Sequence, residues 1–149
     1  MQVNETEYTW QAALVNRWIE AFNGHDVSTI VGLYADDAIL FDSGMKRPRH
    51  GRGEIEEWFT TRFHAMPTIT YLPASQMYTE TGVAVTWTTR GRIPRILGQK
   101  WLARSFQVDG VSIFTLENGL IQKQRGYYDH LTPLEQILPF LKWVLPRRL

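Results

Sequence analysis

The chain of 149 residues contains no cysteine. Disulfides, thiolate metal sites and cysteine nucleophiles are therefore excluded. No apolar run reaches the roughly 18–20 residues that a membrane span requires. The 16 basic and 15 acidic residues nearly cancel, to a net charge of +1, which argues against a nucleic-acid partner. The N-terminal segment lacks the basic and apolar regions of a signal peptide, which predicts a cytoplasmic protein.

Hydrophobic residues make up 44% of the chain and charged residues 21%, the composition of an ordinary globular protein. We find no internal repeat, low-complexity stretch or linker, so one domain over residues 1–149 is the economical interpretation. Aromatic residues make up 13%, with six tryptophans. So many large rings in a small protein either fill its core or line a ligand cavity.

Hydrophobic periodicity predicts helices followed by strands. Apolar residues recur at helical spacing over residues 6–23, 27–34 and 53–65. Segments rich in β-branched and aromatic residues predict strands over residues 38–41, 69–78, 83–93, 100–116 and 120–129. Asp36-Asp37 predicts a turn before the first strand, and Asn118-Gly119 predicts a hairpin between the last two. Thr132-Pro133 opens a final helix over residues 132–145 that is apolar nearly all round.

This order of elements predicts an α+β domain whose core covers about residues 8–131. A curved antiparallel sheet wrapped on the N-terminal helices would enclose a cone-shaped cavity, the default place for a ligand. The C-terminal helix would close that cavity, pack in a dimer or touch a membrane surface. Together with the open face of the sheet, it predicts a homodimer.

Asp42 is the most informative polar residue. It follows the apolar run at residues 38–41 and precedes Ser43-Gly44. A carboxylate at the end of a buried strand costs free energy unless it is paired or protonated, which makes Asp42 a candidate general base. The alternative is a strand-end aspartate that caps the next turn through its own backbone.

Other polar residues are weaker candidates. Asp129 ends the last predicted strand and is either an acid/base group or a cap. His50 lies in the loop after Asp42 and would edge a pocket, but the four histidines show no metal-ligand spacing. Thr88 and Arg90 share one face of a strand. If that face lines the cavity, Arg90 would bind a carboxylate or an enolate, and otherwise it is surface.

Three segments resemble the nuclear transport factor 2-like superfamily. They are residues 18–26, residues 33–38 and the loop that ends in His50-Gly51 before a helix. The resemblance covers most of residues 8–131, and the most similar members are ketosteroid isomerases and SnoaL-like polyketide cyclases. It implies the fold described above. It does not imply one activity, because the superfamily includes isomerases, cyclases, epoxide hydrolases, dehydratases and non-catalytic binders.

The resemblance implies roles for three residues in catalysis. Asp42 aligns without a gap onto the aspartate that is the general base of the isomerases. Trp18 falls at the place of their oxyanion-binding tyrosine, and Ser112 at the place of their protonated aspartate. An indole N–H donates one hydrogen bond but is a poorer acid than a phenol. The candidate ligand-binding residues are Leu40, His50, Trp58, Thr88, Arg90, Tyr128 and Asp129.

The sequence departs from the other families. The cyclases carry an Arg-Asp pair in the last strand, where this chain has Arg125-Gly126. The Asp-Arg-Asp trio of limonene-type epoxide hydrolases is replaced by Thr88, Arg90 and Gly126, so a hydrolase is the least favoured reading.

We therefore predict a cofactor-independent and metal-independent isomerase or cyclase that acts on a hydrophobic small molecule through Asp42. The alternative is a non-catalytic domain of the same fold that binds a hydrophobic ligand or dimerises.

Overall fold

The computed structural model describes residues 8–92 and 105–130. The helices of these residues are α1 (Thr9–Asn23), α2 (Val27–Gly32) and α3 (Gly51–Ala65). The strands are β1 (Tyr34–Asp42), β2 (Arg49–His50), β3 (Thr70–Thr79), β4 (Gly82–Arg92), β5 (Ser105–Glu117) and β6 (Leu120–Tyr128). The predicted helix at residues 132–145 lies outside the described residues.

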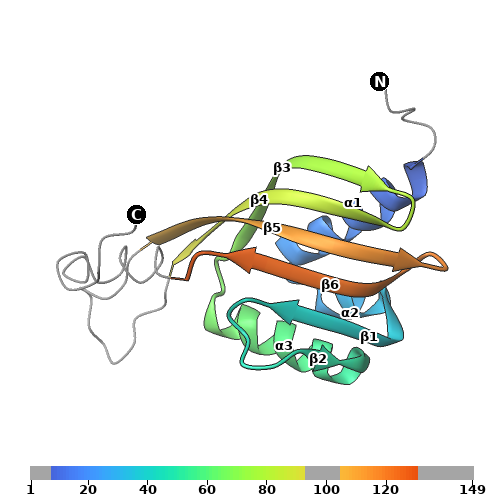
Figure 1. The fold of residues 1–149 in the computed structure, drawn as a ribbon. Helices are drawn as coiled ribbons and strands as arrows, with labels where there is room; N and C mark the ends of the chain where they lie inside the picture. The colour runs from blue at the N-terminus through green and yellow to red at the C-terminus, as the bar shows by residue number, and fades with distance from the viewer. Residues whose placement is uncertain (1–7, 93–104, 131–149) are drawn as a thin grey trace.

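The strands form one curved, unclosed sheet in the order β2-β1-β6-β5-β4-β3, and the helices pack on one of its faces (Figure 1). The predicted α+β class and the wrapped sheet are confirmed. One pair departs from the antiparallel pattern, because β1 runs parallel to β6 and Asp42 pairs with Gly126. The Asn118-Gly119 hairpin joins β5 to β6, and both of its residues have the positive φ that such a turn requires.

Alternation along the strands decides which side chains face the helices. On β4, Val85, Trp87 and Thr89 are buried, whereas Thr86 and Thr88 lie on the opposite face. The sheet edge at β3 tolerates Pro73, because an edge strand has a free side where a missing N–H costs no ladder hydrogen bond.

The predicted turn at Asp36-Asp37 is wrong. Strand β1 already begins at Tyr34, and its pairing with β6 shifts register between Tyr34 and Ile39. This bulge takes the two exposed aspartates out of the regular ladder, so two adjacent carboxylates fit within a strand without being buried. Residues 49–50, predicted as loop, form the short strand β2 against β1.

The core is an aromatic cluster centred on Trp18 of α1. Its ring lies 5.3–6.1 Å, between centroids, from those of four residues that come from α1, α3, β3 and β5: Phe22, Phe59, Tyr71 and Phe114. Edge-on and tilted contacts of this kind stabilise a fold beyond the burial of the rings alone. The cluster joins the helices to the inner face of the sheet.

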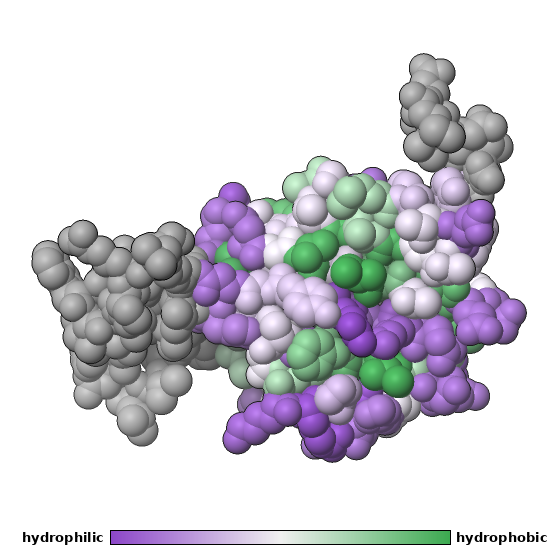
Figure 2. All heavy atoms as spheres, viewed as in Figure 1, coloured by the Kyte–Doolittle hydropathy of each residue, from purple (hydrophilic) through white to green (hydrophobic). Residues whose placement is uncertain are grey.

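The outer face of the sheet is open to solvent and mixes apolar and polar side chains (Figure 2). Exposed apolar side chains on it include Leu72, Met77, Ile113 and Tyr127. No helix in the described residues is both long enough and apolar enough to cross a membrane.

Substituting Gly82, where β4 begins, tests the packing of the sheet. A Cβ at this position would overlap the carbonyl oxygen of Phe114 on β5. We expect Gly82→Ala to lower the free energy of unfolding by about 1–3 kcal/mol, because backbone atoms must shift. Urea denaturation measures the change. In the control Gly53→Ala on α3, the new methyl group meets nothing within 4 Å, and we expect unchanged or slightly higher stability. Equal stability of the two variants would contradict the described β4–β5 packing.

Candidate functional site

A small pocket lies between the inner face of the sheet and the helices α1 and α3, with a volume of about 40 Å³. Its aromatic lining consists of Trp18, Phe22, Phe41, Trp58, Phe59, Tyr71 and Trp87, and its polar lining of Asp42, Arg62, Thr89, Ser112 and Gln124. Sites for drug-sized ligands usually measure roughly 300–1,000 Å³. A ligand of that size therefore enters only if some of these side chains move.

The lining residues differ in exposure from one end of the pocket to the other. Asp42, Trp58 and Arg62 are half-buried, and we call their end the mouth. Trp18, Tyr71 and Ser112 are almost fully buried, and we call their end the deep end. A ligand entering at the mouth would meet charged groups first and hydroxyl groups last.

The two carboxylate oxygens of Asp42 have different surroundings, one in the turn and one at the pocket. Its Oδ1 accepts a hydrogen bond of 2.8 Å from the backbone N–H of Gly44, and its carbonyl oxygen accepts another from Met45. Its Oδ2 faces Gly126 of β6, where a Cβ would lie only 3.4 Å away. Both interpretations of Asp42 thus have a structural basis, because one oxygen caps the turn and the other remains at the pocket.

Two further residues converge on Asp42 at the mouth. Burial raises the pKa of the Tyr128 hydroxyl, and the negative charge of Asp42 raises it further, while Arg62 opposes both effects. The same hydroxyl would lie 2.6 Å from a Cβ at residue 44, so only glycine fits there without a shift. The charges of Asp42 and Arg62 therefore both lie close enough to the Tyr128 hydroxyl to act on it.

Trp18 lines the pocket, but its N–H is already engaged. The indole donates a 3.0 Å hydrogen bond to the Tyr34 hydroxyl, which in turn donates to Oε1 of buried Gln124. Burial raises the pKa of Tyr34, so its hydroxyl stays protonated and keeps donating. This chain links α1, β1 and β6, and it leaves Trp18 without a free donor for an oxyanion.

Ser112 lies beside Tyr71 at the deep end. Its Oγ accepts a 2.9 Å hydrogen bond from the indole N–H of Trp87, which leaves the hydroxyl proton of Ser112 to donate. The Tyr71 hydroxyl is shielded from solvent and has no hydrogen-bond partner among the described residues. Burial raises its pKa, and the Ser112 hydroxyl offsets part of that rise. The side chain of Asn23 on α1 holds Tyr71 in place, because its oxygen accepts the backbone N–H of Tyr71 and its NH₂ group donates to the backbone carbonyl of Tyr71.

The structure brings some of the predicted site residues together and separates others. Leu40 and Trp58 line the pocket with Asp42, Trp18 and Ser112, and Tyr128 adjoins it. The others lie elsewhere: Thr88, Arg90, His50 and Asp129.

On the outer face of the sheet, Thr88 donates to Asp109 and Arg90 donates to Gln107. They are separated from the pocket because residues adjacent to inward-facing Trp87 and Thr89 must face outward. His50 lies with Ile39 and Phe41 in a different, outer hollow. Asp129 is exposed beyond the end of β6.

Several residues of the site were not predicted, among them Arg62, Tyr71 and Gln124. Strand alternation carried a signal for two of them, since Tyr71 and Gln124 lie on the buried faces of β3 and β6. Arg62 follows Trp58 by four residues, so both lie on the same face of α3. The pairing of Trp18 with Tyr34 had no signal in the sequence.

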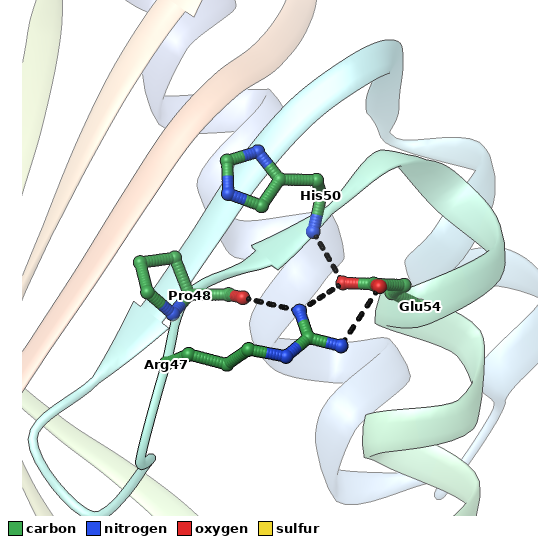
Figure 3. Close-up of polar contacts among 4 residues, drawn as sticks. All are labelled: Arg47, Pro48, His50 and Glu54. Atoms are coloured by element: carbon green, nitrogen blue, oxygen red, sulfur yellow. Dashed lines mark hydrogen bonds and ion pairs between the residues drawn. The ribbon is translucent and has the colours of Figure 1, made fainter.

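The loop that follows Asp42 is fixed to α3 by Glu54 (Figure 3). Both of its carboxylate oxygens bind Arg47, at 2.8 and 2.9 Å, and Oε2 also accepts the backbone N–H of His50. These bonds, led by the one from Arg47, lower the pKa of Glu54 to about 2. The described residues contain no group of acidic or histidine side chains that could hold a metal ion.

The sequence also matches a known protein family. The model of the SnoaL-like domain matches residues 15–124. The chain belongs to the SnoaL-like domain family. The match includes Trp18, Asp42, Ser112 and Gln124, so both ends of the pocket are part of the SnoaL-like domain. No curated protein matches the sequence.

Solved structures share the fold of this SnoaL-like domain. A proposed SnoaL-like polyketide cyclase from Jannaschia sp. CCS1 is 17% identical, with a TM-score of 0.79 over 92% of this chain and 97% of that one. IdmH, a proposed polyketide cyclase from Streptomyces antibioticus, is 22% identical, with a TM-score of 0.74 over 85% and 96%. A protein from Catenulispora acidiphila with a ketosteroid isomerase-like fold, in complex with trimethylamine, is 18% identical, with a TM-score of 0.74 over 83% and 91%. Likeness at these identities shows the fold.

Two buried tyrosines allow a matched test of the site. Tyr34→Phe removes the link between Trp18 and Gln124 and leaves two buried polar groups unpaired. We expect a loss of about 1–3 kcal/mol in the free energy of unfolding. Tyr71→Phe removes a buried hydroxyl that accepts or donates no hydrogen bond within the described part of the chain, so we expect unchanged or higher stability. Chemical denaturation of both variants measures this difference, and a larger loss for Tyr71→Phe would contradict the described hydrogen bonds.

The ion pair of Glu54 predicts a pH dependence. The folded pKa lies near 2, below the ordinary value of 4.5, so the pair stabilises the fold above about pH 4.5. This stabilisation disappears as the pH falls from about 4.5 to 2. We expect the melting temperature of Glu54→Gln to lie below that of the wild type near pH 6, and the two to converge near pH 2. Glu56→Gln, an exposed residue of the same helix, serves as the control and should show no such convergence. A constant difference for Glu54→Gln would refute the prediction.

Proposed function

We propose that this domain binds a hydrophobic small molecule with a carbonyl group and transfers a proton within it through Asp42. The proposal rests on the different surroundings of the two carboxylate oxygens of Asp42. The Gly44 amide holds Oδ1, while Oδ2 is turned toward Gly126 at the mouth of a pocket with aromatic walls. A general base needs such a fixed position and one oxygen available to the substrate.

The proposed step needs no cofactor. Oδ2 of Asp42 takes a proton from the carbon next to the carbonyl, and the electron pair of the broken C–H bond passes into an enolate. In a β,γ-unsaturated substrate, return of the proton to the γ-carbon moves the double bond into conjugation and completes an isomerisation. In a substrate with a second carbonyl group, attack of the enolate carbon on that carbonyl carbon breaks its C=O π bond and closes a ring. In the second case, the new alkoxide recovers the proton from Asp42.

The negative charge of the enolate requires hydrogen-bond donors at the deep end. Ser112, predicted for this role, has a proton to donate because its oxygen accepts from Trp87. We assign to Tyr71 the role predicted for Trp18, since its buried hydroxyl has no hydrogen-bond partner among the described residues. A donor of this kind is typically worth about 3–4 kcal/mol in the barrier.

Binding without catalysis is the second candidate. Two observations favour it: the small volume of the pocket and the engagement of the Trp18 N–H with Tyr34. In that case, Asp42 caps the turn and the pocket holds an apolar ligand unchanged. The homodimer expected from the open sheet face stays a prediction that sedimentation would measure.

Asp42→Asn tests the proposal. The Asn side-chain oxygen still accepts the Gly44 N–H, so we expect the fold to persist while the base is lost. The assay follows a panel of hydrophobic β,γ-unsaturated ketones in D₂O by proton NMR, which detects both isomerisation and deuterium exchange. We expect wild-type turnover to fall by about 10²–10⁴-fold in the variant.

Asp37→Asn is the matched control, because Asp37 lies on the same strand but is exposed and accepts a hydrogen bond from Gln122. It should keep wild-type turnover. If Asp42→Asn turned over the same ketones as fast as the wild type, Asp42 would not be the base. Binding of these ketones without any turnover in the wild type would support the second candidate.

A further inference from the structure

We propose that the ligand of this pocket is a hydrophobic carboxylic acid, whose carboxylate binds Arg62 and Arg49 at the mouth while its apolar body enters between the rings. The inference rests on the proposed binding of a hydrophobic molecule in this pocket, and it adds the chemical class of that molecule. It does not depend on proton transfer by Asp42.

The geometry of the mouth is centred on Trp58. The guanidinium carbon of Arg62 lies 5.6 Å from the centroid of this indole, and that of Arg49 lies at the same distance. Arg62 comes from α3, one turn after Trp58, and Arg49 comes from β2. Two cations from different elements are thus held against one half-buried ring that lines the pocket.

Neither arginine has an acidic partner within the described residues. The ion pairs there join Arg47 to Glu54 and Arg52 to Asp36. The positive charge of Arg49 contributes to the lowered pKa of Glu54. Both carboxylate oxygens of Glu54, however, are bound to Arg47. The Nε of Arg49 is shielded from solvent without a hydrogen-bond partner in the described part of the chain.

This arrangement favours an anion. Two like charges near one ring repel each other, and the charge of a bound anion offsets that repulsion. A carboxylate fits best, because its two oxygens match the planar fork of a guanidinium. An aromatic acid would in addition place its ring beside Trp58 and continue into the apolar pocket.

The position of Arg62 links this anion site to Asp42. Arg62 lines the pocket and acts on the Tyr128 hydroxyl, which also responds to the charge of Asp42. A bound carboxylate would therefore lie in the same neighbourhood as the Asp42 carboxylate. The two negative charges are compatible there because Arg62 offsets their repulsion.

Calorimetric titration with two matched probes tests the inference. The probes are 1-naphthoate and the neutral 1-naphthylmethanol, which have the same ring system. We expect the wild type to bind the naphthoate about tenfold more tightly, a difference that corresponds to about 1.4 kcal/mol. High salt should reduce this preference, because the mouth is partly exposed.

Variants of the arginines test whether Arg62 and Arg49 cause the preference for the acid. Arg62→Gln should abolish the preference for the acid, Arg62→Lys should keep part of it, and Arg49→Gln should weaken it. Arg90→Gln on the outer face should retain the full preference, which controls for the loss of one positive charge. Thermal melting confirms that each variant is folded.

The inference is overturned if the wild type binds the two probes equally or not at all, or if Arg62→Gln and Arg62→Lys both keep the full preference. These outcomes are separable from the failure of proton transfer. Loss of turnover in Asp42→Asn without any preference for the acid would leave the proposed function standing and refute the carboxylate site. A preference that depends on Arg62, without turnover of any ketone, would leave a binding site for hydrophobic acids.

Discussion

The packing of the Trp18 indole between the helices and the sheet is the interaction on which the rest of the structure depends. Its ring contacts Phe59, Tyr71 and Phe114, and its N–H begins the hydrogen-bond chain through Tyr34 to Gln124. One side chain thus packs two helices against the sheet and satisfies polar groups on β1 and β6. The same two strands carry Asp42 and Gly126, which pair with each other in the ladder.

Much of the fold could be predicted from local patterns. Alternation and turn residues placed β4, β5, β6 and the Asn118-Gly119 hairpin, and helical spacing placed α1 and α3. The start of β1 could not be placed, because Asp36 and Asp37 are turn formers that a register shift accommodates within a strand. The parallel pairing of β1 with β6 is a long-range contact, which no local pattern contains.

Some of the residues that line the candidate pocket could be predicted from the sequence, but their hydrogen-bond partners could not. The apolar run before Asp42 and the alignment of Ser112 place both residues on the pocket, as the structure has them. The sequence suggested Trp18 as a free donor, yet its N–H finds a closer acceptor in Tyr34. Arg62 and Tyr71 come to the pocket only through packing of α3 and β3, so their roles emerge from three-dimensional contacts.

The parallel pairing of β1 with β6 sets the order in which the domain is completed. Residues 34–42 are made early, but their partner strand, residues 120–128, is the last of the described elements. Until β6 is in place, the apolar run at residues 38–41 forms part of an unpaired strand edge, the kind of segment that associates with other chains. Contacts between such distant segments slow folding, since the long loop between them must close first. The side of the pocket that holds Asp42 is therefore the part that a nascent chain finishes last and exposes longest.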